Sequence, residues 1–265
     1  MSSLTCTLIQ TPLHWENKQA NISMFEEKIN NLHEKTEVVI LPEMFSTGFS
    51  MKPKIFAETM QDETVSWMKR IASQKKVILT GSVMIKENGN YYNRLIWMLP
   101  NGNYGCYDKR HLFAYGKEDE HYKPGDKRLI ASVKGWKINL QVCYDLRFPV
   151  WARQSPASSN EPEYDLLIYV ANWPERRNVA WKTLLQARAI ENQCYVIGVN
   201  RIGNDGNNIY HSGDSMVIDP LGEILYHNEH KEEAFTITLQ KEWLTEVRNK
   251  FPFWRDADKF VITHE

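Results

Sequence analysis

The chain has 265 residues, of which 42% are apolar, and its 32 basic and 33 acidic side chains leave a formal net charge of −1. This length and composition suffice for one buried core, so we expect a single domain that spans residues 1–265. The balanced charge provides no overall field that would attract nucleic acid or an anionic membrane, and no segment reaches the roughly 18 apolar residues that span a bilayer. These features favour chemistry on a small molecule.

The predicted elements of the first half alternate between short apolar runs and helical patterns. In chain order, they are a strand at 4–10, a helix with Ile22, Phe25, Ile29 and Leu32 on one face, a strand at 38–41, a helix near 62–75 and a strand at 77–85. The sequences ENGN and PNG then mark the turns of two hairpins.

The second half continues the same alternation after a Ser- and Pro-rich surface loop at 154–163. Its predicted elements are strands at 136–142, 165–170 and 194–200, a helix at 180–192 and a hairpin at 215–227 with its turn at 219–222. Runs such as VVIL and LLIYV are apolar throughout, as in strands that are covered on both faces. We therefore expect an α/β fold in which helices flank the sheets.

Cysteine usage indicates the compartment. Cys6, Cys106, Cys143 and Cys194 lie far apart and form no CxxC pair, and a domain of this size does not depend on disulfides. The first residues, MSSLTCTLIQTPLHW, contain neither the basic segment nor the long apolar segment of a secretory signal. We therefore expect a protein of the reducing cytoplasm.

Three apolar strands end in a polar or reactive side chain. Glu43, Cys143 and Asn172 each stand just after a run of apolar residues. Because ligands of open α/β sheets bind at the carboxyl ends of the strands, these three residues are predicted to converge on one site.

Cys143 has the surroundings of a nucleophile. The following residues, YDLRFP, predict a turn from a strand into a helix, with Pro149 in the first helical turn. A thiol near a helix N-terminus has its thiolate stabilised by the helix dipole. The other three cysteines lie in or beside strands and are expected to be part of the core.

A nucleophilic thiol needs a proton acceptor and a partner for the negative charge that develops on the substrate. Glu43 is a candidate base, because desolvation at the end of an apolar strand raises the pKa of a carboxyl group. Lys109, among aromatic and apolar residues, is a candidate cation. His111 and His121 lie near it in sequence and leave a Cys–His arrangement open.

The segments ILPEMFSTGF, YDKRHLF and CYDLRFP, in this order, resemble those of the carbon-nitrogen hydrolase (nitrilase) superfamily. The similarity extends over almost the whole chain. Within the superfamily, NWPERRNVAW and FPFWRDADKF are most similar to the bacterial ω-amidase branch.

This resemblance implies a four-layer αββα sandwich and a triad of Glu43, Lys109 and Cys143. It also implies a second glutamate, for which the spacing to the glycine in KEDEHYKPG selects Glu118, with Glu120 as the alternative. It implies no metal or organic cofactor, and a homodimer paired through helices.

For the substrate, the resemblance implies the terminal amide of a short α-keto dicarboxylate, such as 2-oxoglutaramate. Lys109 and the backbone N–H of Tyr144 would hold the oxyanion, and Arg176 or Arg177 the free carboxylate. Phe45 and Trp173 would form walls of the pocket.

Three alternatives remain open. The first is another superfamily branch, a nitrilase or an N-carbamoyl amide hydrolase. The second is a non-catalytic binding protein on the same fold, and the third is a Cys–His hydrolase with His111 as base.

Overall fold

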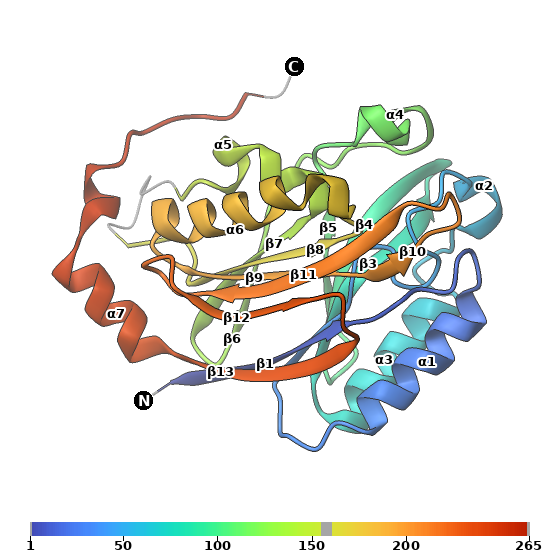
Figure 1. Ribbon diagram of the computed structural model, residues 1–265, viewed down its shortest axis with the longest axis horizontal. Coiled ribbons are helices and arrows are strands. Elements are labelled where there is room, and N and C mark those ends of the chain that lie inside the picture. The colour runs from blue at the N-terminus through green and yellow to red at the C-terminus, as the bar shows by residue number, and fades with distance from the viewer. Residues whose placement is uncertain (1, 155–160, 264–265) are drawn as a thin grey trace.

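Two β-sheets lie face to face between two layers of helices in the computed structural model, which describes residues 2–154 and 161–263 (Figure 1). Helices α1 (Lys18–Asn30) and α3 (Glu63–Lys75) cover one sheet, and α5 (Pro149–Ala152) and α6 (Asn178–Asn192) lie on the other. This is the four-layer αββα sandwich that the resemblance implied. Most of the loop predicted at 154–163 lies outside the described residues.

The first sheet is built around three parallel strands, β1 to β3, with antiparallel strands added at both edges. In spatial order its strands are β13 (Glu233–Gln240), β1 (Ser3–Gln10), β2 (Val38–Ile40), β3 (Ile78–Glu87), β4 (Asn90–Met98) and β5 (Tyr104–Asp108).

The second sheet also has a parallel centre, formed by β7, β8 and β9. In spatial order its strands are β10 (Ile202–Asn204), β11 (Tyr210–Ile218), β9 (Tyr195–Asn200), β8 (Leu166–Ala171), β7 (Trp136–Val142) and β6 (Leu129–Val133), and β12 (Ile224–Glu229) pairs with β11.

Strand β2 shows why the central strands are apolar throughout. Val38 and Ile40 pack in the cluster between the two sheets, whereas Val39 packs with the residues of α1 and α3 on the opposite face. Both faces of the strand are therefore dry, so a polar residue would be tolerated only beyond its end. Glu43 stands there, three residues after Ile40.

The predicted helices and hairpins are confirmed, with one local difference. Ile22, Phe25 and Ile29 are buried on one face of α1, but the helix ends at Asn30, so Leu32 lies beyond it. The backbone of Asn31 closes the helix by donating to carbonyls of its last turn.

Several elements were not predicted from the sequence. They are β6, β10, β13, α2 (Pro53–Phe56), α4 (Glu118–His121) and α7 (Lys241–Lys250). On one face of the pair formed by β13 and β1, threonine hydroxyls meet, Thr5 with Thr238 and Thr7 with Thr236, while Ile237 and Leu239 on the other face of β13 pack in the cluster between the sheets. This alternation of apolar residues and threonines is typical of a half-buried strand, so the pattern was present in the sequence and was overlooked.

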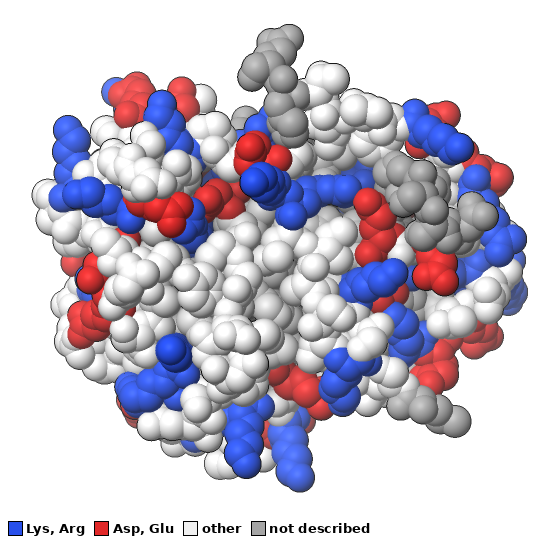
Figure 2. All heavy atoms as spheres, turned by 180° about the vertical axis from the view of Figure 1, so that it is seen from behind, with Lys and Arg blue, Asp and Glu red and all other residues white. Residues whose placement is uncertain are grey.

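The surface agrees with the balanced composition. Figure 2 shows basic and acidic side chains interspersed around an uncharged central area on one face of the molecule. Within residues 2–154 and 161–263, no helix combines the length and the apolar content needed to cross a membrane.

Candidate active site

The three strand ends predicted to converge do meet. Cys143 follows β7 and Asn172 follows β8, and these strands are parallel neighbours in the second sheet. Asn172 connects them to the first sheet, because its backbone N–H donates to Glu43 Oε2 at 2.8 Å and its Nδ2 donates to the Glu43 carbonyl at 2.6 Å. The site therefore bridges the two sheets.

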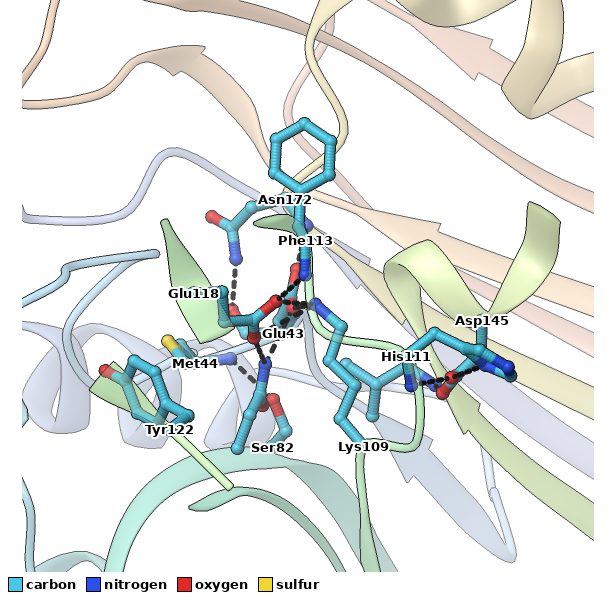
Figure 3. Close-up of polar contacts among 12 residues, drawn as sticks. Glu43, Met44, Ser82, Lys109, His111, Phe113, Glu118, Tyr122, Asp145 and Asn172 are labelled. Atoms are coloured by element: carbon cyan, nitrogen blue, oxygen red, sulfur yellow. Dashed lines mark hydrogen bonds and ion pairs between the residues drawn. The ribbon is translucent and has the colours of Figure 1, made fainter. Parts of the chain in front are cut away.

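Lys109 joins two buried carboxylates. Its Nζ lies 2.9 Å from Glu43 Oε1 and 2.8 Å from Glu118 Oε2, and all three side chains are fully buried. Figure 3 shows the ammonium group pointing between the two glutamates. Burial alone would lower the pKa of Lys109, but the charges of Glu118 and Glu43 hold it well above its ordinary value. The lysine is thus a fixed cation.

The Cys143 thiol is protonated in this environment. Burial, followed by the negative charge of Glu43, raises its pKa well above the ordinary value, although Lys109 acts in the opposite direction. Among the charged groups, Glu43 has the largest effect on the pKa of the thiol. A proton acceptor is therefore already in place beside a thiol that has to lose its proton to react.

The backbone at Cys143 is strained. Its φ of +46° lies in the left-handed region, which non-glycine residues rarely occupy. Asp145 stabilises the turn, since its Oδ2 accepts from the Val142 N–H at 3.0 Å and its Oδ1 from the His111 N–H at 2.9 Å. The residues after Cys143 form a short 3₁₀ turn, and the α5 helix begins at Pro149, as predicted.

Asn93 is a member of the cluster that the sequence analysis missed. Its Nδ2 donates to Glu43 Oε1 at 2.8 Å and to Glu118 Oε1 at 3.1 Å, so one amide spans both carboxylates. Its backbone carbonyl accepts from the N–H of Lys109 at 3.0 Å. Asn93 lies in the middle of β4, next to Arg94, so the strand-end pattern that marked Glu43 and Cys143 did not mark it.

A cavity of about 200 Å³ opens beside Cys143. Its lining includes the side chains predicted to contact substrate, Tyr144, Trp173 and Arg176, and also Arg177, Arg147 and Phe113. This volume is below the roughly 300–1,000 Å³ of clefts that hold drug-sized ligands, so the cavity suits a small substrate.

Comparison with known proteins agrees with this geometry. The family model for carbon-nitrogen hydrolases matches residues 5–249. The chain belongs to the carbon-nitrogen hydrolase family. Over 263 residues this hydrolase is 44% identical to the protein named omega-amidase YafV of Escherichia coli strain K12, covering 99% of this chain and 100% of that protein.

Two further relatives point the same way. The hydrolase is 30% identical over 261 residues to the 2-oxoglutaramate amidase of Bacillus subtilis strain 168, covering 96% of this chain and 98% of that protein. Its fold matches the crystal structure of XC1258 from Xanthomonas campestris, a CN-hydrolase superfamily protein with an arsenic adduct in its active site. That match has a TM-score of 0.97 at 42% identity and covers 99% of this chain and 100% of the other.

The two candidates for the second glutamate of this hydrolase have different environments. Glu118 begins the short helix α4 and is fully buried against Lys109, and its Oε2 also accepts from the Phe113 N–H at 2.7 Å. Glu120, in the same helix, is exposed. The geometry favours Glu118, as the spacing to the glycine predicted.

Phe45 does not take the place expected for it. It is fully buried in the cluster under α1 and α3, where its ring meets Phe25 edge-on at 5.5 Å and Trp67 at 5.8 Å, and it does not line the cavity. The chain turns after Glu43, so the ring points toward the helices. Its assignment as a pocket wall was wrong.

The contacts of the His111 side chain are with Asp145 and Phe148. Its Nδ1 lies 2.8 Å from Asp145 Oδ1, and its ring stacks on Phe148 at 3.8 Å. The charged groups with the largest effects on the Cys143 thiol are Glu43, Lys109 and Glu118. The geometry thus favours a glutamate base over a histidine base.

One group of residues in the described part of the chain has donors suited to a metal ion, namely Asp214, His227 and Glu229. The Asp214 carboxylate is already engaged by His227 at 2.8 Å, by Lys182 at 3.3 Å and by the Ser212 hydroxyl. Because Lys182 already supplies a positive charge there, the group gives no reason to place a metal.

Proposed function

We propose that this protein is an ω-amidase, which releases ammonia from the terminal amide of short α-keto dicarboxylic acid monoamides such as 2-oxoglutaramate. The observation that carries this proposal is the buried cluster of Glu43, Lys109 and Cys143 beside a small cavity with guanidinium groups in its lining. The names of the relatives, an omega-amidase and a 2-oxoglutaramate amidase, support the same reaction.

In the first step Glu43 accepts the thiol proton while Cys143 Sγ attacks the amide carbon. The amide oxygen becomes an oxyanion, which is stabilised by Lys109 Nζ and the backbone N–H of Tyr144. Glu118 also holds the ammonium group in position, and Asn93 holds both carboxylates.

In the second step the tetrahedral intermediate collapses to a thioester on Cys143. The C–N bond breaks, and the nitrogen leaves as ammonia with the proton that Glu43 carried. Glu43 then takes a proton from a water molecule that attacks the thioester carbon. Breaking the C–S bond releases the carboxylic acid, and the proton returns to the thiol.

The substrate is held by the aromatic and cationic lining. Trp173 is nearly fully buried and its ring borders the cavity, where it would contact the methylene groups of the substrate. The guanidinium groups at Arg176 and Arg177 would face the free carboxylate, since arginine binds a carboxylate through two parallel hydrogen bonds.

Ammonia release from three substrate types tests this function. We expect turnover of 2-oxoglutaramate and much slower turnover of a short aliphatic nitrile and an N-carbamoyl amine. Preference for the nitrile or the carbamoyl compound would place the protein in another branch of the family. No ammonia from any of them would support a binding protein on the same fold.

We also propose that residues 1–265 form one hydrolase domain that acts in the reducing cytoplasm as a homodimer. The compartment is supported by the free thiols of all four cysteines. Apolar side chains on α5 and α6 are exposed and offer a surface for pairing, namely Val150, Val179 and Ile190. Light scattering of the purified protein tests the dimer, which alanine at these three positions should weaken.

A further inference from the structure

Three arginines line the cavity that contains Cys143. Arg147 follows Cys143 on the 3₁₀ turn, and Arg176 and Arg177 lie on the short turn before α6. All three also line an adjoining, more open hollow to which Cys143 does not contribute. The guanidinium groups therefore stand between the nucleophile and solvent, where the far end of a bound amide would lie.

Two of these arginines are held by aromatic rings. The Arg177 guanidinium lies 5.0 Å from the centre of the Phe113 ring, and that of Arg147 lies 5.0 Å from the Trp173 ring. The Arg177 carbonyl also accepts from Trp173 Nε1 at 2.8 Å. Both side chains are half-buried, whereas Arg176 is exposed. Stacking leaves the edges of the planar groups free for a ligand.

These arginines lack an anionic partner. Among the residues that the structure describes, no carboxylate forms an ion pair with any of the three, whereas the half-buried Arg128 and Arg248 each have one. Asp205 also lines the cavity, but its Oδ1 accepts from the N–H groups of Asn207 and Ile209 in its own loop. Burial, followed by the neighbouring charge of Arg176, lowers the pKa of Arg177.

Neighbouring cations without a counter-ion repel one another, so an anion that enters between them relieves an unfavourable charge arrangement. We propose that Arg177, assisted by Arg147, forms a carboxylate-binding site that selects linear amides whose far end is anionic. Arg176, the arginine favoured from the sequence, contributes charge from solvent without being the main ligand. This inference rests on the proposed amidase function and identifies the residue that determines its specificity.

A pair of matched substrates tests the site. Succinamate ends in a carboxylate and succinamide in a neutral amide of the same shape, so the ratio of their kcat/KM values measures recognition of the charge. This ratio cancels any general loss of catalysis. The variants are Arg177→Leu, Arg147→Leu and Arg176→Leu. The control is Arg255→Leu, because Arg255 also stacks on an aromatic ring, at 5.3 Å from Trp254, but does not line the cavity.

We expect Arg177→Leu to lower the preference for succinamate by about 10²-fold, the size typical of losing hydrogen bonds between charged partners. Arg147→Leu should lower it by about tenfold, and Arg255→Leu should leave it within about twofold. Arg177→Lys, which keeps the charge but not the planar fork, should give an intermediate ratio. A ratio in Arg177→Leu within twofold of the parent protein, or a larger loss in Arg176→Leu, would overturn the proposal.

Calorimetric titration with succinate separates this site from the proposed function. Succinate is the hydrolysis product of succinamate, and its binding requires no turnover. Weaker binding of succinate to Arg177→Leu than to the parent protein supports the site even if neither amide is hydrolysed, a result that would refute only the amidase function. Equal binding to both proteins would overturn the site.

Discussion

Replacing Lys109 with methionine tests the charge arrangement of the buried cluster. The ammonium group lies 2.9 Å from Glu43 and 2.8 Å from Glu118, and none of the three side chains is exposed to solvent. Removing one partner of a buried ion pair typically costs about 3–5 kcal/mol, because the remaining charge loses its compensation. We expect Lys109→Met to lower the free energy of unfolding by about that amount.

The catalytic effect of the same variant should be separate from its effect on stability. If Lys109 holds the oxyanion, its loss lowers kcat and kcat/KM together by about 10² to 10³-fold, while KM changes little. The double variant Lys109→Met/Glu118→Gln has one buried negative charge fewer than Lys109→Met alone. It should therefore recover much of the lost stability, but none of the lost activity.

Urea unfolding and steady-state ammonia release measure the two quantities. An increase in KM with kcat unchanged would refute the oxyanion role and assign Lys109 to anchoring the substrate. Failure of the Glu118→Gln change to restore stability would show that Glu118 does not carry the uncompensated charge.

Three further predictions concern other residues of the site and its surroundings. Asn93→Leu should lower kcat about tenfold or more, because Glu43 and Glu118 lose the amide donor that holds both carboxylates in position; an unchanged kcat would contradict this. Phe45→Ala should cost about 3–5 kcal/mol of stability in urea unfolding with little change in KM, since the ring packs in the core; a rise in KM without loss of stability would instead return it to the pocket. Burial lowers the pKa of His211 to about 4, so the unfolded chain takes up its proton first as pH falls from about 6.5, and stability is lost until about pH 4. His211→Asn should reduce the slope of unfolding free energy against pH in that window by up to about 1.4 kcal/mol per pH unit, and an equal slope in both proteins would contradict it.

The layers of the fold could be predicted because the central strands are buried on both faces. Runs such as VVIL and LLIYV have to be covered by helices, and the residues just beyond them are the first that can be polar. This reasoning placed Glu43, Cys143 and Asn172 together correctly. It did not find β13, because only every second residue of that strand is apolar, which is the pattern of a half-buried strand instead of a continuous apolar run.

The directions of side chains beyond the strand ends were harder to predict from the sequence. Phe45 lies only two residues after Glu43, yet the turn between them sends one side chain into the site and the other into the helical layer. Glu118 and Glu120 lie in one short helix, where positions two residues apart point in roughly opposite directions, about 200° around the axis. Which of them faces Lys109 depends on how the loop carrying α4 packs, so the choice of Glu118 rested on the family resemblance and the spacing to the glycine, with no support from a local pattern.

Asn93 was missed for a different reason. It lies within a strand instead of at its end, and its role depends on two carboxylates that are 50 and 25 residues away in sequence. No local pattern encodes such a contact. A polar residue at a buried strand position is nevertheless a useful indicator, because it requires a partner.

The central claim is that Cys143 carries the acyl group during the reaction. Rapid acid quenching of the protein with 2-oxoglutaramate, followed by mass spectrometry of the intact chain and its peptides, tests this directly. We predict an adduct with the mass of the substrate minus ammonia, confined to the peptide that contains Cys143 and absent from the Cys143→Ala variant. An adduct on Cys6, Cys106 or Cys194, or continued ammonia release by Cys143→Ala, would contradict the account.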